Sequence, residues 1–496
     1  MSVTVLSSQP RVLYHSLTWP ESPFLQIPSL ASATLRNLSA LEGSQTVKNT
    51  PRSSSMKLTR PSETRRFGLL HISEEVYHVP EHGRTSGDGS QTDAGNSEAN
   101  TECYSGGTLD AILSEMIIVV PCKDEELSVI RGVISAIPAP CLVILVSNCQ
   151  RQSDDDDYLQ QVDMVKAFGG DKRQLLAIHQ KDAAAAAAFK ESGMAELCGP
   201  DGTIRDGKGE GIILGVALAA ALCPARRYIG FVDADNLRAG SVHEYCLAFA
   251  AGFAMSLSRD REDTMVRLKW ASKPKLRDNG RVELVKEGRC SRIVNSWLNK
   301  LFAAGDGQGS DGRNTNFITT GNAGEHAMSM GLALKLRMAA GYAIEPYHFV
   351  DLLERAYLSP SRVTQGSDGV KNQPQPLERP VRIVQIQTLS PHYHRETDND
   401  HIRRMWAAGL GSVFHGLATY HSRPGSDDGE ILKLRQELQG FAVEHRNVDD
   451  ITGELPRPRV YSALEDTDLR KFRKIIEPST GKGSLRAFGF AGDKQA

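Results

Sequence analysis

The sequence predicts an α/β protein with a doubly wound, mostly parallel sheet, and two observations support this prediction. Short apolar runs rich in β-branched residues recur between residues 116 and 235, as expected of strands buried on both faces. Segments whose apolar residues follow a helical period separate these runs. Strand and helix alternation of this length folds as right-handed crossovers on a parallel sheet.

Four buried strands are expected in the first half, in MIIVVP from residue 116, CLVILVSN from 141, QLLAIHQ from 174 and RYIGFVDAD from 227. The helices expected between them are KDEELSVIRGVISAI, DDDDYLQQVDMVKAFG, the alanine-rich DAAAAAAF and GEGIILGVALAAALCP. The last of these ends at Pro224, which cannot continue a helix.

The second half has a mixed pattern. Strands are expected in RFGLLHISEEVYHV, TMVRLKWAS and VRIVQIQTLS, and helices in SRIVNSWLNKLFAAG and IRRMWAAGLGSVFHGLATY. Residues 317–346 are expected to form a loop, a helix and a glycine turn. Residues 1–55 lack any period and are expected to be a disordered extension, and 82–107, rich in Gly, Ser, Asp and Asn, to be a flexible insertion.

Composition excludes several classes of protein. The 496 residues carry 58 Lys and Arg against 60 Asp and Glu, so no charge excess favours nucleic acid or an anionic membrane. No apolar stretch reaches the roughly 20 residues of a membrane helix. The eight cysteines include no CxxC pair, which indicates buried thiols in a reducing compartment and hence a cytoplasmic protein.

Two carboxylates follow the fourth expected strand. Asp233 and Asp235 in GFVDADN lie at a strand's carboxyl end, the edge of an open α/β sheet where ligands bind. Such a pair can hold Mg²⁺ or Mn²⁺ together with water and diphosphate oxygens. The alternative is a turn in which Asp235 or Asn236 caps a following helix.

Other segments contain polar or flexible residues suited to binding. PCKDEE opens a helix after the first strand, and its acids alone would suit the helix dipole. RDGKGEG at 205–211 places Lys208 among glycines and lacks the spacing of a P-loop, so a plain flexible loop is its alternative. TTGNAGEH at 319–326 is expected to enter a helix, whose start could bind phosphate or serve only as a cap. PHYHRE at 391–396 offers two histidines to a metal or merely to solvent.

Taken in order, these segments resemble the mannosyl-3-phosphoglycerate synthases, retaining glycosyltransferases of the A-type nucleotide-sugar fold. The resemblance runs from about Arg65 to Tyr420 and rests on PCKDEE, LVILVSN, HQKD, IRDGKGEGIILG, YIGFVDADN, AAGFAMS, MVRLKW, TTGNAGEHAMSM, GYAIEPYHFVDLLE and LSPHYH. The sequence departs from the family's pattern at Arg238, Ser390 and Arg395.

The resemblance implies roles for particular residues. Those expected at the nucleotide sugar are Pro121, Lys123, Glu125, Ser147, Lys208 and Asp233. Asp235 should hold the metal, completed by His392 or His394. The acceptor candidates are Arg289, Ser291, Thr320, Gly321, Asn322 and Ala323. Asp233, Asp235 and Lys208 are expected to carry catalysis.

The resemblance also implies GDP-mannose and D-3-phosphoglycerate as substrates, a divalent metal as cofactor, and is compatible with a homodimer. Residues 56–240 would bind the nucleotide sugar, 241–422 would bind the acceptor and complete the metal site, and 423–496 would form a partly helical tail. The alternatives are a glucosyl-3-phosphoglycerate synthase and a non-catalytic nucleotide-sugar-binding protein. A nucleotidyltransferase is disfavoured, because its glycine-rich loop should directly follow the first strand.

Overall fold

The computed structural model describes residues 56–59, 64–78, 101–150, 157–169, 173–257, 263–276, 281–305, 316–357, 375–393, 399–420, 428–445 and 453–490. Residues 1–55, most of the predicted insertion, and His394 lie outside the described residues.

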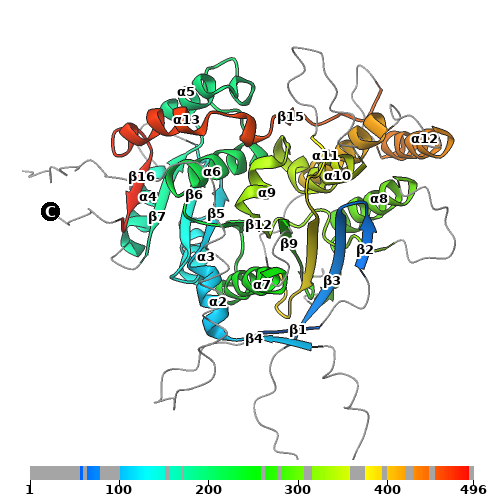
Figure 1. Cartoon of the computed structure of the whole chain (residues 1–496), viewed down its shortest axis with the longest axis horizontal. Helices are drawn as coiled ribbons and strands as arrows, with labels where there is room; N and C mark the ends of the chain where they lie inside the picture. The colour runs from blue at the N-terminus through cyan, green and yellow to red at the C-terminus, as the bar shows by residue number, and fades with distance from the viewer. Residues whose placement is uncertain are drawn as a thin grey trace, which may run out of the picture.

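A sheet of 12 strands runs through the described part of the molecule in the order β16-β7-β6-β5-β8-β12-β9-β14-β3-β1-β4, with β2 paired to β3 (Figure 1). Its strands are β1 Met56–Thr59, β2 Thr64–Phe67, β3 Leu70–His78, β4 Thr101–Tyr104, β5 Met116–Cys122, β6 Leu142–Ser147, β7 Leu175–His179, β8 Tyr228–Phe231, β9 Asp263–Lys269, β12 His326–Ser329, β14 Val381–Gln387 and β16 Arg486–Phe488. Every strand predicted from the sequence is present.

Seven neighbouring strands share one direction, namely β7, β6, β5, β8, β9, β14 and β3, and β12 runs against them between β8 and β9. The carboxyl ends of these seven strands therefore meet the amino end of β12 at one edge of the sheet. The predicted α/β class with a mostly parallel sheet is confirmed.

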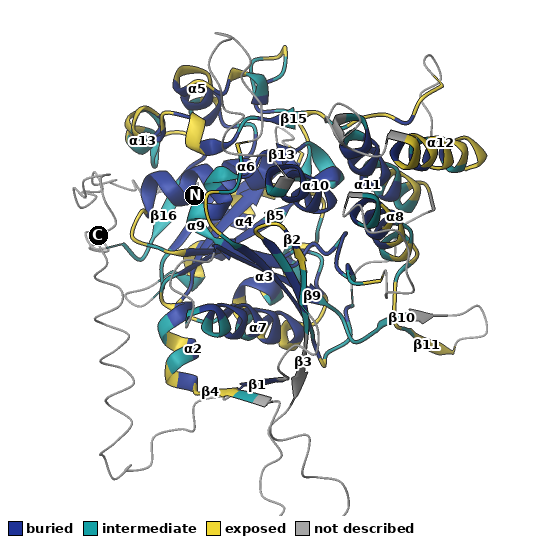
Figure 2. Cartoon of the chain, turned by 45° about the vertical axis from the view of Figure 1, so that its right-hand side comes forward, coloured by how far each residue is buried: buried dark blue, intermediate teal, exposed yellow. Residues whose placement is uncertain are grey.

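Helices cover both faces of the sheet and enclose two hydrophobic cores (Figure 2). One face packs against α2 Gly106–Leu113, α3 Leu127–Ala136, α4 Asp157–Phe168 and α7 Ala239–Leu257. The other packs against α5 Ala183–Ser192, α6 Lys208–Leu222, α8 Arg289–Gly305, α10 Ile344–Tyr357, α11 Asn399–Tyr420, α12 Asp428–Glu444 and α13 Leu469–Ile476. Helix α6 is apolar all round, and fourteen of its fifteen residues are buried. Within the described ranges, no helix is both long and apolar enough to cross a membrane.

Two sequence expectations are wrong in detail. The TTGNAGEH loop enters strand β12, not a helix, because His326–Met328 pairs with β8 on one side and with β9 on the other. The expected helix is the six-residue α9, Met330–Lys335. In the range 82–107, residues 101–104 form β4 and α2 begins at Gly106, so this end of the predicted insertion is ordered structure.

The segment after residue 423 is helical in part and also packs against the main sheet and the helices that cover it. Strand β16 extends the main sheet by pairing with β7. Phe472 of α13 is fully buried, with its ring 4.8 Å from that of Phe189 on α5. Tyr461 donates its hydroxyl proton to the buried carboxylate of Glu210 on α6, at 2.7 Å.

Candidate functional site

The DADN turn follows β8 at the carboxyl edge of the sheet. Asn236 holds this turn, because its side-chain amide donates to the Asp233 carbonyl at 2.8 Å and to Glu325 Oε1 at 2.9 Å. Among the described residues no group donates to Asn236 Oδ1, so Asn236 does not cap the following helix.

Lys208 at the start of α6 is the cation nearest to this turn. Its ammonium lies 2.6 and 2.8 Å from the two carboxylate oxygens of Asp233 and 2.7 Å from Glu345 Oε1. Burial lowers the pKa of Lys208, but the two carboxylates more than offset this, and the pKa stays well above its ordinary value. Lys208 is therefore a fixed positive charge.

Around Asp235, the carboxylates of Asp233, Glu125 and Glu325 outnumber the ammonium groups of Lys208 and Lys273. Burial, followed by the charges of Asp233 and Glu125, raises the pKa of Asp235 to about 7. Burial and Asp233 also raise the pKa of Glu325. A bound cation would relieve this repulsion, so the residues fit a divalent metal. Among the described residues, no group of three or more His, Cys, Asp or Glu side chains is arranged to hold a metal ion.

The loop after β14 lies directly on the DADN turn. The Leu237 N–H donates to the Tyr393 carbonyl at 2.9 Å, and Arg238 stacks over the Tyr393 ring at 4.3 Å. His392 is buried, and its ring stacks on Trp270 with centroids 4.0 Å apart. The tertiary structure thus brings the loop that carries His392 to the turn that carries Asp235.

The TTGNAG loop reaches the same place from the amino end of β12. A Cβ atom at Gly324 would collide with Asp233 Oδ2 and lie 2.9 Å from Lys208 Nζ, so only glycine allows this approach. The predicted phosphate site at a helix start is absent here, because the loop enters a strand. Asn322 Oδ1 is buried without a hydrogen-bond partner.

Side chains from three elements hold this loop. Arg267 on β9 donates to the carbonyls of Thr320, at 3.0 Å, and Ala323, at 3.3 Å. Gln385 on β14 accepts from the Thr320 hydroxyl at 2.7 Å, and Asn295 on α8 accepts from the Gly321 N–H at 2.7 Å. Arg267 is fully buried, and its burial lowers its pKa to about 9. Among the described residues no carboxylate forms an ion pair with it.

The ends of β5 and β6 form the other side of the site. The Asn148 N–H donates to the Cys122 carbonyl at 2.8 Å, and the Lys123 N–H donates to Glu125 Oε2 at 2.6 Å. Burial raises the pKa of Glu125. Ser147 is fully buried, and its hydroxyl accepts from the Cys149 N–H at 3.3 Å.

Arg289 and Ser291 begin α8, and Lys273 is a second cation close by. A Cβ atom at Gly288 would lie 3.8 Å from both Lys273 Nζ and Ser291 Oγ. Lys273 also lies over the Trp270 ring at 4.1 Å, and its charge opposes the rise in the pKa of Asp235.

Sequence reasoning missed five site residues: Lys273, Trp270, Arg267, Glu325 and Glu345. All except Lys273 lie within motifs quoted above, but no spacing rule marks a buried arginine in a strand as a site residue.

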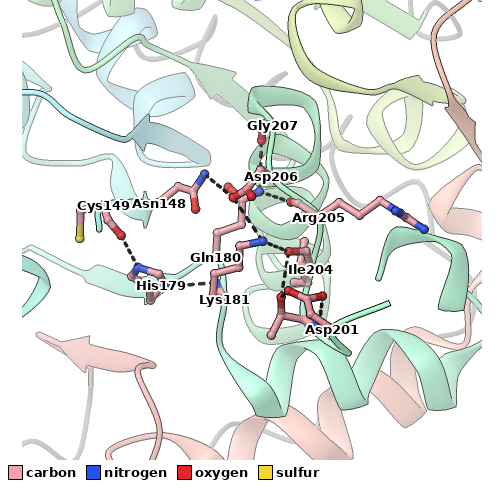
Figure 3. Close-up of polar contacts among 11 residues, drawn as sticks. Asn148, Cys149, His179, Gln180, Lys181, Asp201, Ile204, Arg205, Asp206 and Gly207 are labelled. Atoms are coloured by element: carbon pink, nitrogen blue, oxygen red, sulfur yellow. Dashed lines mark hydrogen bonds and ion pairs between the residues drawn. The ribbon is translucent and has the colours of Figure 1, made fainter. Parts of the chain in front are cut away.

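The HQKD segment after β7 fixes the loop that carries Lys208 (Figure 3). Gln180 donates to the carbonyls of Arg205, at 2.6 Å, and Gly207, at 3.2 Å. Lys181 donates to the Ile204 carbonyl at 2.7 Å. This loop is therefore an ordered part of the site, and the flexible-loop alternative is wrong.

Comparison with known proteins identifies the family. Residues 60–476 match the family model described as mannosyl-3-phosphoglycerate synthase (osmo_MPGsynth). The match extends past Tyr420, where the sequence resemblance ended, and includes α13.

Two curated relatives are named mannosyl-3-phosphoglycerate synthase. The one from Pyrococcus furiosus is 36% identical over 366 residues, which is 74% of this chain and 85% of the relative. The one from Aeropyrum pernix is 30% identical over 377 residues, 75% of this chain and 87% of the relative.

Solved structures of glucosyl-3-phosphoglycerate synthase from Mycobacterium tuberculosis are more distant. The complex with Mn²⁺, UDP-glucose and glycerol 3-phosphate has a TM-score of 0.41 and 16% identity, over 73% of this chain and 95% of that chain. The complex with Mn²⁺, UDP and glucosyl-3-phosphoglycerate has a TM-score of 0.39 and 16% identity, over 66% and 86%. From the family model and the two curated relatives, we conclude that this chain is a glycosyltransferase belonging to the mannosyl-3-phosphoglycerate synthase family.

Proposed function

We propose that the enzyme transfers mannose from GDP-mannose to the 2-hydroxyl of D-3-phosphoglycerate, with retention of configuration at the sugar. One observation carries this proposal. The Lys208–Asp233 ion pair lies against Gly324 of the TTGNAG loop, and the charges of both its members act on Asp235. This proximity supports a donor site at the DADN turn next to an acceptor site at the TTGNAG loop.

The donor side consists of the strand ends and the loop before α6. Pro121, Lys123 and Glu125 border the nucleotide base, Ser147 binds the nucleotide, and Asp233 binds the ribose. Lys208 supplies positive charge for the diphosphate that leaves. Because its partners already fix it in place, it needs little reorganisation as charge develops in the transition state.

A divalent metal, Mg²⁺ or Mn²⁺, would be held by Asp235 and His392, with His394 as the second candidate. When bound, it would neutralise charge on the leaving diphosphate. The carboxylate excess around Asp235 supports this assignment.

The acceptor side consists of the loop Thr320–Ala323 together with Arg289 and Ser291 at the start of α8. The acceptor carries a phosphate and a carboxylate, which bind best to guanidinium, hydroxyl and backbone N–H donors. We assign no protein nucleophile, because a leaving phosphate oxygen can itself help to deprotonate the acceptor hydroxyl on the retained face.

All eight cysteines are free thiols, which supports a reducing, cytoplasmic location.

The test is to incubate the full-length protein with Mg²⁺, 3-phosphoglycerate and, separately, GDP-mannose, GDP-glucose and UDP-glucose. We expect mannosyl-3-phosphoglycerate, identified by mass spectrometry, with the anomeric configuration read from NMR coupling constants. A product formed only from a glucosyl donor would favour the glucosyl alternative. Binding of nucleotide sugars with no product from any donor would favour the non-catalytic alternative.

A further inference from the structure

Asp206 is an exposed carboxylate held in place by two side chains from neighbouring strand ends (Figure 3). Asn148, which follows β6, donates to Asp206 Oδ1 at 3.3 Å. The ammonium of Lys181, which follows β7, lies 3.2 Å from the same oxygen. The side chain of Asp206 is nevertheless 68% exposed, and none of the described residues donates to its Oδ2. A carboxylate has about four acceptor positions, so this group keeps capacity for a ligand.

The backbone around Asp206 is fixed as well. Gln180 binds the carbonyls on both sides of it, those of Arg205 and Gly207, and Lys181 binds that of Ile204. An exposed side chain on a loop ordinarily adopts several positions. Here side-chain and backbone contacts from the β7 end hold the carboxylate before any ligand arrives, which reduces the ordering cost of binding.

The location of Asp206 matches the proposed donor site. It lies two residues before Lys208, the cation of the diphosphate end. Through Asn148 it also touches the ends of β5 and β6, because the Asn148 N–H binds the Cys122 carbonyl. The carboxylate is thus on the loop that connects the diphosphate end to the base end of the site.

We infer that Asp206 determines the base specificity of the donor by accepting hydrogen bonds from the N1–H and the exocyclic amino group of guanine. This inference rests on the function proposed above. Guanine presents these two donors side by side, whereas uracil presents one N–H between two carbonyl oxygens. A carboxylate can accept hydrogen bonds from both donors of the guanine edge. On uracil it would instead lie close to carbonyl oxygens, which also carry negative partial charge. A polar group left without a matching partner lowers the binding affinity strongly. Asn148 and Lys181 act as positioning residues.

The experiment measures nucleotide binding by isothermal titration calorimetry with the full-length protein in Mg²⁺. The ligands are GDP, UDP and IDP, whose hypoxanthine base lacks the exocyclic amino group of guanine. We expect the parent to bind GDP about 5- to 150-fold more tightly than UDP, the range that one matched pair of hydrogen bonds provides. IDP should be intermediate. The Asp206→Asn variant should lose most of the preference for GDP over UDP and most of the preference for GDP over IDP.

Asp201→Asn is the matched control. It removes one negative charge from the same loop, but among the described residues the Asp201 carboxylate accepts hydrogen bonds from Thr203 alone, at 3.1 and 2.7 Å. This variant should keep the parent's ratio of GDP affinity to IDP affinity and its ratio of GDP affinity to UDP affinity.

Two results would overturn the inference, and they differ in meaning. If the parent prefers GDP and Asp206→Asn keeps both ratios, the assignment to Asp206 is wrong while the proposed donor stands. Glu125→Gln then tests the other carboxylate at the base end. If the parent has no preference for GDP, both the inference and the proposed donor are wrong.

Discussion

Several side chains at the site occupy positions that are unfavourable for their charged forms. Asp233 and Glu345 contact the ammonium group of Lys208, and the charges of Asp233 and Lys208 also act on Asp235 and Glu325. Burial, together with the charge of Asp233, raises the pKa values of Asp235 and Glu325. Such shifts concentrate where a protein binds a charged ligand, and here the excess negative charge favours a cation.

Asp235→Ala should lower turnover by about 10²–10³-fold, the range observed when one electrostatic contact to a transition state is removed. The variant should unfold at the same temperature as the parent or higher, because the lost carboxylate is buried in an unfavourable field. Mg²⁺ or Mn²⁺ should raise the melting temperature of the parent and not that of the variant. The measurements are steady-state rates and thermal denaturation with and without metal. Near-normal turnover at saturating Mg²⁺ would mean that Asp235 has no role in transfer.

His392→Phe should raise the metal concentration needed for half-maximal activity. The phenyl ring keeps the stacking on Trp270 and removes the imidazole nitrogens. Imidazole suits Mn²⁺ better than Mg²⁺, so the effect should be larger with Mn²⁺. Tyr245→Phe is the control, since it removes only the hydroxyl that lies 3.2 Å from His392 Nδ1. His394→Ala should have a smaller effect. If both histidine variants keep the parent's metal dependence, neither histidine is a ligand.

At the scale of elements, the TTGNAG loop takes its shape from β9, β14 and α8 rather than from its own residues. Arg267, Gln385 and Asn295 each bind loop backbone or hydroxyl groups. A loop of small residues has many accessible conformations, and these contacts select one. Its position beside Lys208 is therefore a property of the assembled sheet.

Arg267→Met should reduce kcat/KM for 3-phosphoglycerate by about 10²-fold, since a misplacement of about 1 Å has that effect. GDP binding and the far-UV circular dichroism spectrum should stay at the parent's values. Arg267→Lys should recover only part of the loss, because one ammonium cannot replace a guanidinium that spans two carbonyls. If activity falls only in proportion to the folded fraction, with the KM for 3-phosphoglycerate unchanged, Arg267 is purely structural.

Helix α13 stabilises the core beside the main sheet, although it lies far along the chain from the motifs of the site. Phe472→Ala should lower the free energy of unfolding by about 3–5 kcal/mol, because a fully buried ring is replaced by a cavity. Lys471→Ala on the exposed side of α13 is the control and should change it by less than about 1 kcal/mol. Chemical denaturation measures both. Equal stabilities would mean that α13 does not contribute to the core.

At the scale of the whole molecule, both halves of the predicted catalytic unit share one sheet. Strand β8 from the first half pairs with β12 from the second, and β12 pairs with β9. The reversed direction of β12 brings its amino end to the edge where the parallel strands end. This arrangement brings the segments proposed to bind the donor and the acceptor to one edge of the same sheet.

The start of the folded unit can be tested by shortening the chain. A chain that begins at Met56 should keep the stability and activity of the full sequence, whereas one that begins at Thr64 should lose stability. Met56 and Leu58 of β1 are fully buried, and β1 pairs with both β3 and β4. Thermal unfolding and product formation measure the outcome. Loss of folding or activity in the chain that begins at Met56 would show that residues 1–55 are required.

The sequence by itself determined the class of fold and the residues that end the strands. Runs such as LVILVS and YIGF are apolar on both faces and can be stable only inside a covered sheet. The carboxylates of DADN and the HQKD segment follow such runs directly. Local pattern is sufficient here, because a strand's burial and its end depend on neighbours in the chain.

Only the tertiary structure decided which segments meet. HAMS became a strand because β8 and β9 offer it hydrogen-bond partners on both sides, although its residues alone suggested a helix. The same holds for Arg267 behind the TTGNAG loop, for His392 beside Trp270 and for Tyr461 on Glu210. Each of these contacts joins residues more than 50 positions apart. Their energies depend on burial and distance in the folded chain, which no local pattern contains.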